Sequence, residues 1–155
     1  MSRDPLRLAD YLGHILESIA QIQNYCEDID EVSFMSNRLI QDAVIRNFEI
    51  IGEASKNVER VAPEFVAAHP ELPLAFAYDM RNLLAHGYYK VDVNVVWKAI
   101  ERDLPYLQEQ VTNSHSCILS GKSRIGHQYD IPFPSIANQG PYSSIFSSSK
   151  HSKII

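Results

Sequence analysis

Apolar residues recur every three or four positions through the first 112 residues, and this spacing limits the possible folds more than any other feature. Between about Asp4 and Asp28 they form one stripe, made of Leu8, Leu12, Ile15, Leu16, Ile19 and Ile22. This period places apolar side chains on one face of an α-helix, whereas a half-buried strand alternates at every second position. Residues 1–112 contain no strand pattern. We therefore predict an all-α fold.

Three further segments carry the same helical period. The predicted helices run from Ser33 or Ser36 to about Val61, from Pro73 to about Ala85, and from Asp92 or Asn94 to about Val111. Residues 63–73 contain three prolines and leave room for little more than two turns. Pro105 predicts a kink near residues 101–104, because proline lacks the N–H that a helix interior requires. The short connections favour an antiparallel bundle of four or five helices.

The second predicted helix has an unusually broad apolar face. One side of it is marked by Leu39, Ala43, Ile50, Ala54 and Val58, and that side is widened by Ile40, Val44, Phe48 and Ile51. A stripe this broad predicts two packing surfaces, one for the domain core and one for a partner.

Charge is divided unevenly along the chain. The 155 residues carry a net charge of −5, which argues against a protein broadly coated with phosphate-binding cations. Residues 1–112 hold 10 Lys and Arg against 18 Asp and Glu, whereas residues 113–155 hold 4 against 1, together with eleven serines. The length suits a single domain. We predict a helical domain at residues 1–112 and a Ser-rich basic tail at residues 113–155 that is disordered or loosely docked.

Composition also indicates a compartment. The two cysteines, Cys26 and Cys117, are too few for a disulfide framework or a zinc cluster. No apolar run approaches the roughly 20 residues that span a bilayer, and the N-terminus lacks the apolar stretch of a signal peptide. We expect a cytoplasmic protein that does not bind a membrane.

Arg81 and His86 form the constellation with the clearest chemistry. An ideal helix would separate them by roughly 140°, but a helix that ends near Ala85, with Gly87 at positive φ, would let His86 swing back beside Arg81. Arginine suits two-point contact with phosphate, and histidine transfers protons near neutral pH. Such a pair could cleave RNA without a metal, using the 2′-hydroxyl as nucleophile. A structural interpretation is also open, in which Arg81 pairs with Asp79 or an acid of the second helix and His86 caps its own helix.

Charged residues of the second helix are candidates for the same site. Asp42, Arg46, Glu49 and Glu53 lie at helical spacing. They either line a cleft beside Arg81, with Arg46, Glu49 and Glu53 supporting it, or form ion pairs on a solvated surface. No histidine joins them at ligand spacing, so we expect no metal site.

Three aromatic side chains receive structural interpretations. His14 and His69 are interpreted as surface or core histidines. Trp97 is interpreted as a core residue and not as a platform for stacking bases.

Three blocks of the sequence resemble the HepT-like toxins of the HEPN superfamily (the DUF86 group). The blocks are Gln41–Lys56 (QDAVIRNFEIIGEASK), Met80–Tyr88 (MRNLLAHGY) and Val95–Ile100 (VVWKAI). They occur in the family's order, and the resemblance covers residues 5–112. The family is marked by Arg-x4-His-x-Tyr, and Arg81, His86 and Tyr88 fill its three positions.

The resemblance implies an all-helical, metal-independent endoribonuclease without a cofactor. Members of the family act as homodimers in which the two Arg-x4-His motifs meet in a cleft. Arg81 and His86 would then be the catalytic residues acting on an RNA such as tRNA or mRNA. Asn82 fits the polar position that commonly follows the arginine.

The resemblance further implies the toxin of a type VII toxin–antitoxin system. An MntA-like nucleotidyltransferase partner would neutralise it by transferring AMP to Tyr88, and Tyr89 lies one position off the motif. Added AMP would bring negative charge and bulk next to Arg81, in competition with RNA phosphate. A different class of function stays open, namely a non-catalytic helical dimer that binds a nucleotide or the nucleotidyltransferase as a regulatory subunit.

Overall fold

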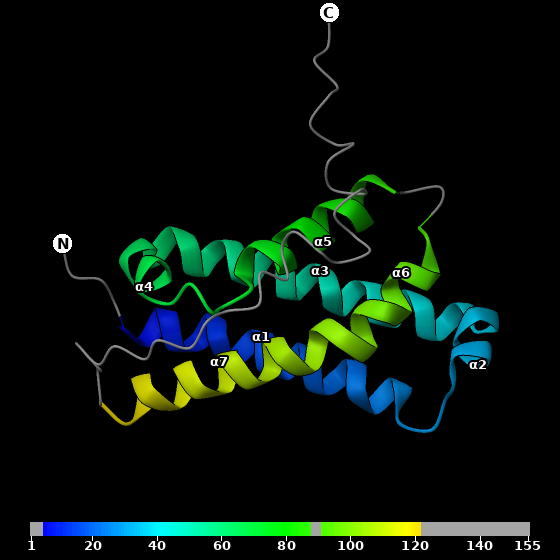
Figure 1. The fold of residues 1–155 in the computed structure, drawn as a ribbon, viewed down its shortest axis with the longest axis horizontal. Coiled ribbons are helices and arrows are strands. Elements are labelled where there is room, and N and C mark those ends of the chain that lie inside the picture. Colours follow the sequence, from blue (N-terminus) through cyan, green and yellow to red (C-terminus); the bar gives the residue numbers. More distant parts are fainter. Residues whose placement is uncertain (1–4, 88–90, 122–155) are drawn as a thin grey trace, which may run out of the picture. The chain divides into compact units, whose positions relative to one another are not determined.

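The computed structural model describes residues 5–87 and 91–121, which all lie in one compact unit formed by residues 1–124. Its helices are α1 (Pro5–Cys26), α2 (Glu31–Ser36), α3 (Arg38–Val61), α4 (Pro63–Ala68), α5 (Leu74–His86), α6 (Val93–Lys98) and α7 (Leu104–Leu119), with a π-helical turn, η1 (Ala99–Asp103), between the last two (Figure 1). The described residues contain no strand. The prediction of an all-α bundle is confirmed.

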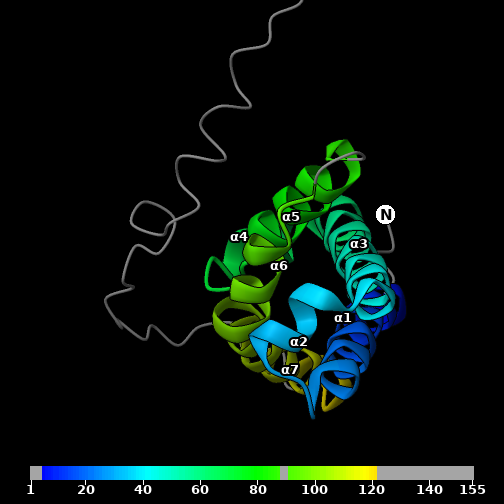
Figure 2. The ribbon, with the colours of Figure 1, turned by 90° about the vertical axis from the view of Figure 1, so that its right-hand side faces the viewer.

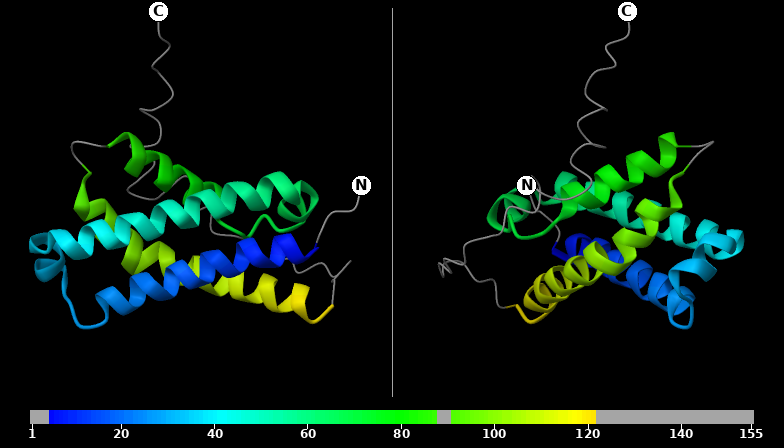
Figure 3. Two further views of the ribbon diagram at one scale, coloured as in Figure 1. Left: turned by 180° about the vertical axis from the view of Figure 1, so that it is seen from behind. Right: turned by 45° about the vertical axis from the view of Figure 1, so that its right-hand side comes forward.

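Helix α1 buries the stripe that the sequence predicts. Leu12, Ile15, Ile19 and Ile22 are completely buried. The helix ends at Cys26, slightly before the predicted end near Asp28. Its buried face packs against α3 and α7 (Figure 3), so this single stripe anchors two of the long helices.

The second predicted helix begins with Asn37 as its cap, one residue after the predicted Ser36, and a short separate helix, which was not predicted, precedes it. Asp30 caps α2 by accepting a hydrogen bond from the Ser33 N–H at 2.8 Å, and Asn37 caps α3 by accepting one from Ile40 at 3.1 Å. The Gln41 amide donates to the carbonyl of Phe34 at 2.7 Å. These bonds turn α2 across the end of the bundle, where it contacts α3 and α6 (Figure 2).

Helix α3 packs against both α1 and α5. Its buried apolar residues are Val44, Phe48, Ile51, Ala54 and Val58. Ile40, Ala43 and Ile50 are only partly buried, and the prediction that a second surface of α3 serves a partner stays a prediction. Leu39, at the N-terminal end, is 80% exposed.

The last long helix is continuous from α6 through η1 into α7. The disturbance that Pro105 predicts takes the form of a π-helical turn, in which the Leu104 N–H donates to the carbonyl of Ala99. Proline has no N–H to continue the regular bonding, so the widened turn ends where Pro105 enters the helix. The helix then runs to Leu119 and not to the predicted end near Val111, since Ser114 is buried within the bundle.

The core also contains Trp97, as the sequence predicts. Its side chain is 7% exposed, and its ring centroid lies 5.1 Å from that of Phe34. None of the helices in the described residues combines the length and the apolar character needed to cross a bilayer.

Candidate active site

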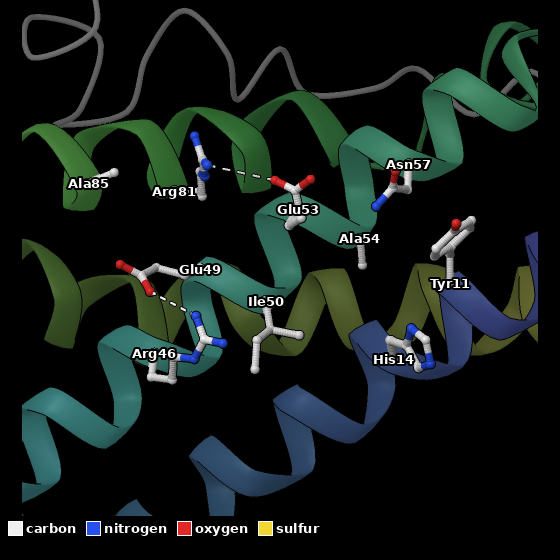
Figure 4. A pocket seen from close by; sticks show the side chains of 10 residues that line it. All are labelled: Tyr11, His14, Arg46, Glu49, Ile50, Glu53, Ala54, Asn57, Arg81 and Ala85. Atoms are coloured by element: carbon white, nitrogen blue, oxygen red, sulfur yellow. Dashed lines mark hydrogen bonds and ion pairs between the residues drawn. The ribbon is translucent and has the colours of Figure 1, made fainter.

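Helices α1, α3 and α5 together line a cleft of about 460 Å³ on the surface of the bundle (Figure 4). Six lining residues come from α3, two from α1 and two from α5; they are Tyr11, His14, Arg46, Glu49, Ile50, Glu53, Ala54, Asn57, Arg81 and Ala85. The α3 residues recur every three or four positions, so one face of this helix forms the length of the cleft.

Gly52 allows Arg81 to lie at the edge of this cleft. A Cβ atom on Gly52 would come within 2.2 Å of the Arg81 Cβ and within 2.8 Å of the Ala77 carbonyl oxygen. The backbones of α3 and α5 can approach this closely only because the glycine has no side chain. Gly52 carried no prediction from the sequence, although a glycine inside a strongly periodic helix is a recognised signal of close packing.

The Arg81 guanidinium has two neighbours that hold its orientation. Its Nη1 donates to the Asn82 side-chain oxygen at 3.1 Å, and its Nη2 lies 3.7 Å from a carboxylate oxygen of Glu53. The structural interpretation, pairing with an acid of the second helix, therefore describes a real contact. The Arg81 and Glu53 side chains are 37% and 60% exposed. An exposed pair at this distance contributes at most about 1 kcal/mol, so an incoming phosphate can replace Glu53.

A second ion pair lies farther along the cleft. The Arg46 Nη1 lies 3.4 Å from a carboxylate oxygen of Glu49. Four charged residues of α3 were grouped by their helical spacing, and three of them, Arg46, Glu49 and Glu53, line the cleft. Asp42 instead pairs with Arg38 on the surface at 3.2 Å. The cleft thus presents two guanidinium groups, each beside a carboxylate.

The structure does not place His86 beside Arg81 in the predicted way. His86 is the last residue of α5, it is exposed, and the cleft is lined by Ala85 instead. Gly87 has a φ of −78°, so the predicted positive φ is wrong, and its N–H continues the helical bonding to Leu83 at 3.0 Å. Because His86 stays helical, its side chain leaves α5 roughly 140° away from Arg81.

Tyr88 and its neighbour Tyr89 lie outside the described residues. Within the described part of the chain, no group of three His, Cys, Asp or Glu residues is arranged to hold a metal ion.

Two residues of α1 enter the cleft without having been predicted there. Tyr11 carried no prediction, and His14 was interpreted as an ordinary surface or core histidine. His14 is exposed and Tyr11 is partly buried. Their sequence signal is weak, because their position depends on how α1 packs against α3.

Comparison with known proteins supplies a family. Residues 15–113 match the family model described as "Ribonuclease HepT-like". The "Probable ribonuclease HepT" of Thermococcus cleftensis is 42% identical over 99 residues, which cover 64% of this chain and 87% of that protein. The "Putative RNase MJ1380" of Methanocaldococcus jannaschii is 36% identical over 101 residues, covering 65% of this chain and 90% of that protein.

A third relative is much longer than the matched region. The protein of Methanocaldococcus jannaschii named "Gamma-glutamylcyclotransferase and putative RNase MJ0434" is 41% identical over 101 residues, which cover 65% of this chain but 44% of that protein. No solved structure matches the chain. The family match contains Arg46, Gly52, Arg81 and His86 and covers more than half of the sequence. The chain belongs to the HepT-like ribonuclease family.

Proposed function

We propose that this chain is a metal-independent endoribonuclease in which Arg81 binds the scissile phosphate and His86 transfers a proton. The observation that carries the proposal is the position of the Arg81 guanidinium, which Gly52 admits to the edge of an open cleft that also holds Arg46. Family membership supports RNA as the substrate. Two guanidinium groups in one cleft suit the spaced phosphates of a single strand.

The proposed reaction needs only groups that RNA and protein already carry. The 2′-hydroxyl loses its proton and attacks the adjacent phosphorus, the bond to the 5′-oxygen of the next nucleotide breaks, and that oxygen takes up a proton. The products are a 2′,3′-cyclic phosphate and a 5′-hydroxyl. His86 moves a proton in this exchange, and Arg81 neutralises the charge that develops on the phosphoryl oxygens.

A second copy of the chain completes the site in this proposal. Arg81 lies at the cleft, whereas His86 leaves α5 in a different direction. The dimer that the family resemblance implies would bring the His86 of one copy toward the Arg81 of the other.

The proposed biological role is that of the toxin in a HEPN/MNT toxin–antitoxin pair. The partner nucleotidyltransferase would transfer AMP to Tyr88, two residues after His86. Negative charge added there opposes the binding of RNA phosphate near Arg81.

The test of catalysis uses purified protein, labelled RNA and EDTA. Wild-type protein is expected to produce fragments with cyclic phosphate ends, and Arg81→Ala and His86→Ala should each reduce the rate at least 100-fold. Arg38→Ala is the matched control, because Arg38 is an exposed arginine of α3 outside the cleft. Cleavage that persists in both variants would show that the catalytic assignment is wrong.

Binding without cleavage, with or without the partner, would favour the regulatory subunit. Mass spectrometry after co-expression with the partner tests the modification separately. We expect the mass to rise in steps of one AMP in wild-type protein but not in Tyr88→Phe, with Tyr25→Phe as control.

A further inference from the structure

Two aromatic rings of α1 line the cleft, and the proposed reaction assigns them no role. The ring centroids of Tyr11 and His14 lie 6.1 Å apart, with the ring planes at 78°. In the view of Figure 4 Tyr11 lies near Asn57 and His14 lies below Tyr11, both on the side of the cleft away from Arg46 and Ala85. Arg46 and Asn57 are eleven residues apart on α3, a distance of about 16 Å along the helix axis.

The cleft therefore has different chemistry along its length. Toward Arg46 and Arg81 it offers guanidinium groups, which bind phosphates, and contacts to phosphate carry no sequence information. Toward Asn57 it offers two rings and an amide. Single-stranded RNA exposes the faces of its bases, and proteins hold such bases by stacking them on tyrosine or histidine rings.

Tyr11 and His14 are more exposed to solvent than the aromatic residues of the core. Trp97 and Phe34 are buried and contact each other, so they present no face to a ligand. His14 is exposed and Tyr11 is partly exposed, and both line the same cleft as Arg81. Tyr25, also on α1 and 40% exposed, lies outside the cleft.

We propose that Tyr11 and His14 form a base-binding subsite, which holds a base of single-stranded RNA while Arg81 binds a neighbouring phosphate. This inference rests on the proposed function, because it takes RNA as the ligand of the cleft. Stacking tolerates every base, so the subsite positions the strand and does not by itself select a sequence.

The test measures binding with probes that cannot be cleaved. One probe is a fluorescein-labelled decamer with 2′-O-methyl groups, which removes the 2′ nucleophile. The other has the same number of phosphates but abasic residues throughout. Tyr11→Leu and His14→Ala should each weaken binding of the first probe about 10-fold and leave binding of the abasic probe nearly unchanged. Tyr11→Phe and His14→Phe, which keep a ring, should restore binding of the first probe.

Two control variants establish whether the loss of binding is specific to the rings in the cleft. Tyr25→Leu should bind both probes like wild type, and Arg81→Ala should weaken both probes equally. Thermal melting and gel filtration report whether a variant has lost its fold or its oligomeric state. Equal weakening of both probes by the Tyr11 and His14 variants, or no weakening, would overturn the subsite.

The outcomes also distinguish the subsite from the proposed function. If binding of the base-bearing probe depends on the two rings but natural RNA is not cleaved, the proposed catalysis is wrong and the subsite stands. If RNA is cleaved but the rings do not discriminate between the probes, the subsite fails and catalysis stands.

Discussion

Gly52 determines how closely α3 and α5 can approach at the candidate site. Gly52 lets α5 approach α3 so closely that the Arg81 Cβ occupies the space where a Cβ of residue 52 would lie. The guanidinium is held by a part-buried hydrogen bond to Asn82 and by a longer, exposed contact with Glu53. Backbone packing thus fixes the base of the Arg81 side chain, and its charged end stays available for exchange with a ligand.

Replacing Gly52 by Ala is expected to destabilise the protein by about 1–3 kcal/mol, because the added methyl group must displace α5. Gly13→Ala is the matched control. The nearest atom to a Cβ there is the His115 Nε2 at 3.7 Å, an ordinary contact. Alanine should therefore stabilise α1 by up to about 1 kcal/mol. Urea unfolding measures both changes, and a Gly52→Ala variant as stable as Gly13→Ala would contradict this packing.

The π-helical turn η1 contains the described carboxyl group with the most perturbed pKa. Burial raises the pKa of Asp103 from its usual 3.8 to about 6, and the nearby charge of Arg102 opposes this shift in part. One carboxyl oxygen is buried and has no hydrogen-bond partner among the described residues. The ionised side chain is therefore disfavoured in the folded protein.

This pKa shift predicts that Asp103→Asn stabilises the folded protein by an amount that depends on pH. Between pH 3.8 and about 6 the unfolded chain ionises this carboxyl before the folded chain does, so its contribution to stability falls as pH rises. Above pH 6 the loss is complete, and we expect the variant to be more stable than wild type by about 1 kcal/mol, a figure reduced for partial exposure. Urea unfolding at pH 4.5 and pH 7.5 should show the difference growing with pH. A difference independent of pH would contradict the assignment.

The helical period predicted the long elements because each buries a single apolar stripe, as Ile15, Ile19 and Ile22 do on α1. The break between α2 and α3 was missed because it depends on which of several polar residues acts as the cap. Asp30 and Asn37 have that role, and Ser33 and Ser36 do not. The extension of α7 was missed because a serine-rich composition hides one buried residue, Ser114. The cleft residues of α1 depend on tertiary packing, which no local pattern encodes.

The net charge of the chain does not describe the local charge of its cleft. Residues 1–112 hold 18 acidic against 10 basic residues, yet two of those basic residues, Arg46 and Arg81, lie in one cleft. Binding of RNA should therefore depend on few phosphate contacts. The serine-rich residues 122–155 lie outside the described part of the chain, and the predicted division at residue 112 stays a prediction.

Few contacts predict a shallow dependence of RNA affinity on salt. Two to four guanidinium groups, counted over one or two copies, give a slope of about −1.4 to −2.8 in log affinity against log salt for single strands. Fluorescence anisotropy of the uncleavable RNA measures this slope when the KCl concentration is varied from roughly 50 to 300 mM. A slope near the roughly −10 of a protein with extensive phosphate contacts would place binding outside the cleft.

The central claim is that Arg81 of one copy acts with His86 of another. Co-expression of Arg81→Ala and His86→Ala chains with different tags, followed by purification through both tags, yields dimers that contain one chain of each kind. Such a dimer retains one pairing of intact Arg81 with intact His86 across the two chains, and none within a chain. The rate at which it cleaves labelled RNA in EDTA should be about half of the wild-type rate, because one of the two Arg81–His86 pairings of the wild-type dimer is intact. Mixed dimers as inactive as each variant alone, beside an active wild type, would contradict the claim.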